Sequence, residues 1–130
     1  MFKKDIQVIV ADDMAGMRLF VVKKLKALGL SNIIEASNGN KVWEVLTAGD
    51  KKIDIIFSDI NMPEMSGIQL LQKIRADKRF ATLPFFIISA EKESKTQKEA
   101  EAAGVTRYLI KPFSEEELKG YLAQINSILE

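Results

Sequence analysis

The sequence predicts an α/β protein of the (βα)5 type, a doubly wound sheet of five parallel strands with helices on both faces. Five short apolar runs of β-forming residues alternate along the chain with longer segments of helical period. Several runs are nearly continuous in apolar residues, which is typical of parallel strands covered on both faces. Such alternation gives right-handed crossovers, and 2-1-3-4-5 is the leading candidate for the strand order. The length of 130 residues fits one domain, 1–130.

The first half of the chain contributes two expected strands and two expected helices. The strands are Ile6–Ala11 and Ile33–Ala36. Between them, apolar residues at positions i, i+4, i+8 and i+11 mark one face of a helix that stops at Gly29, namely Met17, Val21, Leu25 and Leu28. A shorter helix is expected around Val42–Leu46.

The second half repeats the strand–helix pattern three times. Its expected strands are Ile53–Ser58, Phe85–Ile88 and Arg107–Ile110. The expected helices are marked by Gly67, Leu71 and Ile74, by a polar segment from about Ser94 to Ala103, and by Leu118, Leu122, Ile125 and Leu129 after the capping box Ser114–Glu117. Because the polar segment offers only alanines as an apolar anchor, we expect its helix to be among the less stable elements.

The composition excludes several classes of function. There is neither cysteine nor histidine, so disulfides, thiolate catalysis, zinc sites built on these residues and Ser-His-Asp triads are excluded. The 19 basic and 18 acidic residues give a net charge of +1, which does not suggest binding to nucleic acid or to a membrane surface. The N-terminus lacks the apolar region of a signal peptide, and no run approaches the ~20 apolar residues of a membrane span. We therefore expect a cytoplasmic protein.

Polar residues gather where the expected strands end. Asp12 and Asp13 follow the first strand, Asp59 the third, Ser89 the fourth and Lys111 the fifth. Open α/β sheets bind ligands at the carboxyl ends of their strands, near the point where the strand order reverses. The first and third strands are neighbours in the expected order, so the three carboxylates should share one crevice with a hydroxyl and an ammonium beside them.

Three carboxylates this close favour a hard cation that interacts with oxygen ligands, and Mg²⁺ fits that set. A carboxylate beside Mg²⁺ can attack phosphorus and form an aspartyl phosphate. This chemistry needs positioning and charge stabilisation rather than an imidazole base. Lys111 can neutralise a phosphoryl oxygen and Ser89 can donate a hydrogen bond to another.

Each of these residues also has a simpler interpretation when taken alone. The Asp12-Asp13 pair is a common helix N-cap, and Asp59 fits ordinary turn chemistry. Ser89 alone would be a cap or a surface hydroxyl, and Lys111 a solvated lysine. Four independent positions at one end of one sheet weaken these interpretations, and the ring of Pro112 can fix the backbone beside Lys111.

The motifs at these positions resemble those of a known family. They are Asp12-Asp13, Ser58-Asp59-Ile60-Asn61-Met62-Pro63 with Gly67, Ser89-Ala90, and Lys111-Pro112-Phe113. In order and spacing they are similar to the receiver domain of two-component response regulators, over nearly the whole chain. Met17-Arg18, Ile74-Arg75-Ala76-Asp77 and Ala90-Glu91 further resemble the single-domain, CheY-like chemotaxis regulators. The resemblance implies the flavodoxin-like fold already expected from the βα alternation.

The resemblance also implies the chemistry of the site. Asp59 would accept a phosphoryl group from a phosphohistidine of a sensor histidine kinase. Asp12, Asp13, Asp59 and the backbone carbonyl of Asn61 would hold Mg²⁺. Lys111 would contact the phosphoryl group, with a cis peptide to Pro112.

Three further roles are implied for residues around the acceptor. Ser89 would move toward the phosphate, and the ring of Tyr108 would change its orientation with it. Asn61 and Glu91 occupy the positions that tune self-dephosphorylation. The protein would thus be a phospho-acceptor switch and not an enzyme in the usual sense. It would act as a monomer whose surface over the helices at 94–103 and 118–129 and the strand Arg107–Ile110 changes its affinity for a partner.

Two departures from chemotaxis regulators limit what is implied about the partner. Ile60 stands where they commonly have Trp, and Trp43 lies in the expected second helix. We therefore expect Trp43 fluorescence to respond little to Mg²⁺ or phosphorylation. The helix at 94–103 carries charged residues where regulators that bind the flagellar motor show more apolar surface. The partner is accordingly a flagellar switch protein or, as the alternative, another protein of a phosphorelay.

Other classes of function remain as alternatives. A flavodoxin-like electron carrier has the same fold, but Asp12 and Asp13 would repel the FMN phosphate. An aspartate-dependent phosphatase would place an Asp-x-Asp pattern after the first strand, which this chain lacks. A receiver-like module that is never phosphorylated would not need the complete acidic set.

Overall fold

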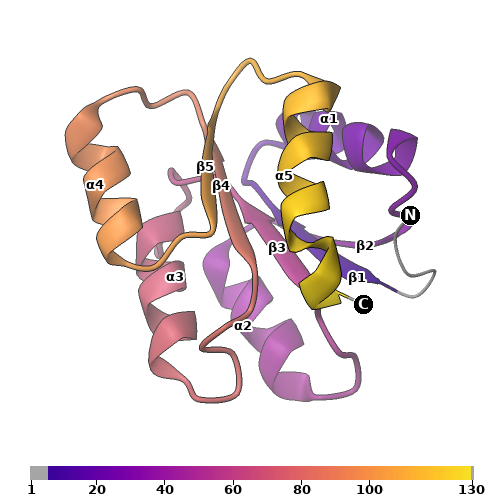
Figure 1. Ribbon diagram of the computed structural model, residues 1–130. Helices are drawn as coiled ribbons and strands as arrows, with labels where there is room; N and C mark the ends of the chain where they lie inside the picture. Colours follow the sequence, from indigo (N-terminus) through magenta and orange to yellow (C-terminus); the bar gives the residue numbers. More distant parts are fainter. Residues whose placement is uncertain (1–5, 130) are drawn as a thin grey trace.

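Strands and helices alternate along the chain in the computed structural model shown in Figure 1, which describes residues 6–129 and side chains as far as residue 124. The strands are β1 (Gln7–Ala11), β2 (Asn32–Ala36), β3 (Ile55–Ser58), β4 (Phe85–Ser89) and β5 (Arg107–Ile110). The helices are α1 (Ala15–Ala27), α2 (Gly39–Ala48), α3 (Gly67–Ala76), α4 (Ser94–Ala102) and α5 (Glu115–Leu129). The sequence-based prediction of a (βα)5 chain is confirmed.

The five strands form one sheet in the order β2-β1-β3-β4-β5, and every neighbouring pair is parallel. In the register of the sheet, Ala11 pairs with Ala36 on one side and with Ser58 on the other. On the far side of β4, Ser89 pairs with Ile110. The residues that follow these positions therefore leave the sheet at one edge, which is the geometry that the expected site requires.

The helices cover both faces of the sheet. Figure 1 shows α1 and α5 on one face and α2, α3 and α4 on the other. On the first face, α1 contributes Val21, Val22 and Leu25 to the core, and α5 contributes Leu118 and Leu122. The core of the second face holds apolar side chains of α2 and α3. The central strands β1, β3 and β4 are buried between the two apolar layers, which explains why their sequences are nearly continuous in apolar residues.

Helix α4 is the exception among the helices of the second face. Ala100 is its one buried residue, so only a small side chain anchors it among the described residues of the core. This agrees with the weak apolar anchor read from the sequence. Its stability relative to the other helices stays a prediction.

The ends of several elements have clear local causes. Helix α3 begins at a capping box in which the hydroxyl of Ser66 accepts from Gln69 N, and α5 begins at the predicted box, where Ser114 Oγ accepts from Glu117 N at 3.0 Å. Helix α1 gives way to Gly29 at φ 95°, as its stop signal predicts. The predicted apolar positions Ile125 and Leu129 lie outside the residues whose side chains are described.

One strand starts later than the sequence predicts. We expected Ile53–Ser58, whereas β3 begins at Ile55. Asp54 instead uses its carboxylate to accept from Gln7 N at 2.9 Å, and its own N–H donates to Gln7 O at 2.9 Å. The other strand ends differ from the prediction by one residue at most. Within the described residues, no helix has the length and apolarity needed to cross a membrane.

Candidate phosphoryl and metal site

The loop after β1 presents two carboxylates to the edge of the sheet. Asp12 is buried at 3% exposure, whereas Asp13 is exposed. The backbone N–H of Asp12 donates to Ala36 O at 3.1 Å, and its Oδ1 accepts from Met14 N at 2.9 Å. The N-cap of α1 is Met14, which makes no side-chain cap bond. The simpler interpretation of Asp12 and Asp13 as the cap of this helix is therefore wrong.

Asp59 is fixed by its neighbours at the end of β3. Its N–H donates to Ala11 O at 3.0 Å, and its Oδ1 accepts from Ile60 N at 2.8 Å. Its carbonyl accepts from Ser58 Oγ at 2.8 Å. A Cβ at Gly67 would lie only 2.2 Å from that carbonyl oxygen, so the backbone of Asp59 can take this path only beside a glycine.

The three carboxylates meet, as the sequence predicts. One oxygen each from Asp12, Asp13 and Asp59 lies within 4.8 Å of the others. The pKa of Asp59 is raised above its ordinary value, chiefly by burial; Lys111 opposes the shift, and the charges of Asp12 and Asp13 add to it. Two neighbouring carboxylates thus disfavour the charged form of Asp59, which a divalent cation would relieve. The donor set is all oxygen, so it fits a hard ion such as Mg²⁺.

Lys111 closes the site from the side of β5. Its Nζ lies 3.7 Å from Asp12 Oδ2, and its side chain is only 16% exposed, so it is not a freely solvated lysine. Its backbone N–H donates to Ser89 O at 2.8 Å, and the Lys111–Pro112 peptide is cis, as the resemblance implies. In this structure the nearest ion-pair partner of the ammonium is Asp12 rather than Asp59.

Ser89, Glu91 and Tyr108 form a connected group beside the carboxylates. Ser89 is buried at 1% exposure, and its hydroxyl accepts from Glu91 N at 3.0 Å. The hydroxyl of Tyr108 donates to Glu91 O at 2.9 Å. Burial raises the pKa of Tyr108, and a hydrogen bond with Ser89 partly offsets the shift. Asn61, the fourth predicted ligand through its carbonyl, is an exposed residue of the loop after β3.

Sequence reasoning did not identify one pair of residues that contacts this site. Arg18 NH1 donates to the carbonyl of Asp12 at 2.7 Å, and its Nε donates to Glu35 Oε1 at 3.0 Å. Arg18 lies in the first turns of α1 and Glu35 lies in β2. No sequence pattern links Arg18 to Glu35, because their contact depends on how α1 packs beside the end of β2.

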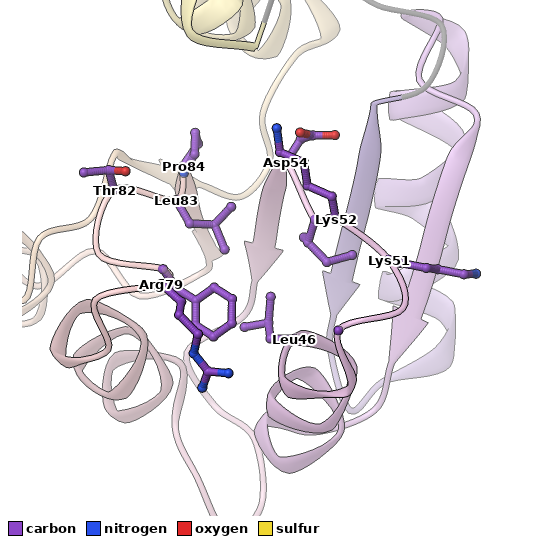
Figure 2. A pocket seen from close by; sticks show the side chains of 11 residues that line it. Leu46, Lys51, Lys52, Asp54, Arg79, Thr82, Leu83 and Pro84 are labelled. Atoms are coloured by element: carbon purple, nitrogen blue, oxygen red, sulfur yellow. The ribbon is translucent and has the colours of Figure 1, made fainter.

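A separate hollow of about 400 Å³ lies at the opposite edge of the sheet, where β3 and β4 begin (Figure 2). Its lining includes Leu46 and Leu83 with charged residues at the rim. Figure 2 shows the side chains of Lys51 and Arg79 extending away from the hollow. It therefore lacks the converging charged groups that the site at the carboxyl edge has.

Comparison with known proteins agrees with the geometry. The family described as "Response regulator receiver domain" matches residues 8–123. The chain is 39% identical over 122 residues to "Chemotaxis protein CheY-3" of Vibrio cholerae, covering 94% of this chain and 92% of that protein. It is 38% identical over 115 residues to "Chemotaxis protein CheY1" of Helicobacter pylori, covering 88% and 91% of the two chains. The solved structure of the Vibrio cholerae chemotaxis protein CheY4 superposes with a TM-score of 0.79 at 28% identity over 92% of this chain and 98% of that one.

Proposed function

Because the chain belongs to the response regulator receiver domain family, whose matching relatives are CheY-like chemotaxis proteins, we propose that it is a signalling switch in which Asp59 accepts a phosphoryl group from a sensor histidine kinase. The observation that carries this proposal is the meeting of three carboxylates within 4.8 Å at the edge of the sheet, with Lys111 against them. This chain has no histidine, so the phosphohistidine that donates the phosphoryl group belongs to the kinase.

Asp12, Asp13, Asp59 and the backbone carbonyl of Asn61 would hold Mg²⁺. When bound, the ion shields the negative charges of the carboxylates and of the incoming phosphoryl oxygens from one another. The raised pKa of Asp59 agrees with this part of the proposal, because burial, and after it the charges of Asp12 and Asp13, disfavour the charged form that a cation would stabilise. Among the charged groups that shift the pKa of Asp59, Lys111 lowers it, whereas Asp12 and Asp13 raise it.

In the reaction, a carboxylate oxygen of Asp59 attacks phosphorus and forms the new P–O bond. The P–N bond to the donor imidazole breaks, and its electron pair stays on the imidazole nitrogen. The ammonium of Lys111 neutralises a phosphoryl oxygen, and the hydroxyl of Ser89 donates a hydrogen bond to another. The hydrogen bond from Ile60 N to Asp59 Oδ1 holds the carboxylate in one orientation while this happens.

The group of Ser89, Glu91 and Tyr108 would carry the signal outward. A phosphoryl group adds nearly two negative charges and three acceptor oxygens beside Ser89. If Ser89 turns toward it, the bond from Glu91 N to Ser89 Oγ changes, and Glu91 also holds the Tyr108 hydroxyl. Helix α4 follows directly and has a small apolar anchor. The face formed by α4, β5 and α5 would then change its affinity for a partner.

An exposed apolar surface lies beside the site. Met14, Leu19 and Phe20 are 62%, 47% and 40% exposed, and the ring of Phe20 meets Phe113 at 6.0 Å in a T-shaped contact. Phe113 follows Lys111 and Pro112, so this surface flanks the carboxylates on the α1 side. All three lie on α1 or directly before it, and exposed apolar patches mark interaction sites. We assign this surface to the kinase domain that carries the phosphohistidine.

The partner on the output side is a flagellar switch protein or another protein of a phosphorelay. The CheY-like relatives favour a role in chemotaxis. The charged surface of α4, with Lys95 and Lys98 exposed and Lys92 exposed in the loop before it, favours the phosphorelay alternative. The protein would act in the cytoplasm as a monomer, and Asn61 and Glu91 would set how fast the phosphoryl group is lost.

Intact-mass measurement after incubation with a small acyl-phosphate donor tests the proposal. The expected result is one added phosphoryl group in the presence of Mg²⁺ and none after chelation. Asp59→Asn should remove the adduct, whereas Asp54→Asn, a matched change in the residue directly before β3, should retain it. No adduct with any donor, or an adduct that persists in Asp59→Asn, would refute Asp59 as the acceptor.

A further inference from the structure

One side chain ties the backbone of the loop that carries Asp12 and Asp13 to both α1 and β2. The guanidinium of Arg18 donates from NH1 to the Asp12 carbonyl at 2.7 Å and from Nε to Glu35 Oε1 at 3.0 Å. The Arg18 side chain is 19% exposed, and that of Glu35 is 48% exposed. A planar guanidinium that bonds in two directions fixes the relative positions of its two partners.

The loop has few other restraints. Met14, the N-cap of helix α1, makes no side-chain cap bond, and the first turn of the helix has no acidic residue. Asp12 is held by its N–H to Ala36 O, by the bond from Met14 N to its Oδ1, and by the ion pair of its Oδ2 with Lys111 at 3.7 Å. The bond from Arg18 is the contact that fixes the Asp12 carbonyl to α1, while Glu35 anchors the guanidinium to β2. The path of the chain through Asp12 and Asp13 is therefore set by β1, β2 and α1 together.

We propose that Arg18, oriented by Glu35, is a positioning residue for the cation site. By holding the Asp12 carbonyl, it fixes the loop so that the carboxylates of Asp12 and Asp13 face Asp59. The inference rests on the proposed function, since it assigns Arg18 a role toward the Mg²⁺ that the carboxylates would bind. Residues that orient metal ligands typically change metal affinity by about 10- to 100-fold when they are replaced.

A positioning role and a purely electrostatic role predict opposite results. Arg18 is a cation near three carboxylates, so on charge alone its removal should tighten the binding of Mg²⁺. If Arg18 holds the loop, its removal should weaken binding, because the carboxylates lose their arrangement. The direction of the change in affinity therefore distinguishes the two roles without reference to its size.

The test is calorimetric titration with Mg²⁺, repeated with Mn²⁺ observed by electron paramagnetic resonance. Arg18→Met should weaken binding of either ion by about 10-fold relative to the wild type. Arg18→Lys retains the charge but lacks the two-direction fork, so it should also weaken binding. Arg79→Met removes the same charge from a residue at the opposite edge of the sheet (Figure 2) and should leave the affinity unchanged. Denaturant unfolding confirms that each variant is folded.

A double-mutant cycle tests the part assigned to Glu35. Glu35→Gln alone should weaken Mg²⁺ binding, but it should add little in the Arg18→Met background, because Glu35 acts through Arg18. At saturating Mg²⁺, Arg18→Met should be phosphorylated at a rate near that of the wild type, as expected when only affinity for the ion is impaired.

The outcomes separate this inference from the proposed function. If the wild type binds neither ion and accepts no phosphoryl group, the proposed function fails. If the wild type binds Mg²⁺ while folded Arg18→Met binds it equally or more tightly, Arg18 does not position the site and only the inference fails. Wild-type affinity in Arg18→Lys would likewise refute the need for the guanidinium fork.

Discussion

Replacing Gly67 with alanine should displace Asp59, the proposed phospho-acceptor, without changing any charged group. Gly67 begins α3 and packs directly against the end of β3, where its N–H donates to Ile60 O at 2.8 Å. An added Cβ would lie 2.2 Å from the carbonyl oxygen of Asp59 and 3.1 Å from the Cα of Ile60. Both are backbone atoms, so no side-chain rotation can relieve the contact.

The size of the displacement follows from these distances. Ordinary van der Waals contact for a Cβ begins at 3.4 Å, so the two backbone segments must separate by roughly 1 Å. Forcing extra volume into a packed position typically costs about 1–3 kcal/mol of stability. A displacement of about 1 Å at a reacting group can cost about 100-fold in rate. We therefore expect a folded but destabilised Gly67→Ala protein with a phosphorylation rate about 100-fold lower.

The assay compares Gly67→Ala with Gly16→Ala. Gly16 lies in the first turn of α1, close in sequence to Asp12 and Asp13, but an added Cβ there would meet nothing within 4 Å. Gly16→Ala should keep the wild-type rate and gain up to about 1 kcal/mol in denaturant unfolding, since alanine favours the helix. Rates are measured with a small acyl phosphate at saturating Mg²⁺. A wild-type rate and unchanged stability in Gly67→Ala would contradict the packing described for Asp59.

Three further predictions concern the electrostatics and the layout of the site. Lys111→Met removes an ammonium that lies 3.7 Å from Asp12. Calorimetry should then show Mg²⁺ binding about fivefold more tightly, while phosphorylation slows by about 100-fold. Weaker Mg²⁺ binding in this variant would show that Lys111 does not compete with the ion for Asp12. Because the pKa of Asp59 is raised in the folded state, the folded protein binds more protons than the unfolded chain just above the ordinary value of 3.8, and stability is lost as pH rises through this window. In Mg²⁺-free buffer, Asp59→Asn should therefore have a higher Tm than the wild type at pH 7, with a gap that shrinks toward pH 3.8; a constant gap would rule out this origin. Trp43 packs against Phe80 at 6.0 Å and under Lys73 at 4.6 Å on the α2–α3 side, so its fluorescence should stay nearly constant on adding Mg²⁺ or a phosphodonor, and a large quench would contradict that separation.

The sequence predicts the elements of the fold well because their physical causes are local. Apolar runs such as Phe85–Ile88 are buried on both faces, and the helical spacing of Leu71 and Ile74 matches the buried side of α3. The late start of β3 was not predictable, because Asp54 is drawn into hydrogen bonds with Gln7, which lies 47 residues away. An expected strand end thus depended on a contact that only the folded chain makes.

The sequence likewise predicts some features of the candidate site and not others. The meeting of Asp12, Asp13 and Asp59 followed from their places at the ends of neighbouring strands. The partner of Lys111 and the bond from Arg18 to the Asp12 carbonyl did not follow, because long side chains can reach several acceptors from one backbone position. Placement at a strand end can be read from sequence, whereas the choice among nearby partners depends on the packed loops.

Locating the phosphorylated residue decides whether Asp59 is the phospho-acceptor. Borohydride reduction of the phosphorylated protein converts an acyl phosphate on aspartate to the alcohol, so the acceptor is recorded as homoserine in a peptide map. We expect homoserine at position 59 alone, and only when Mg²⁺ is present during phosphorylation. Homoserine at position 12 or 13, or an equal yield after chelation of Mg²⁺, would contradict it.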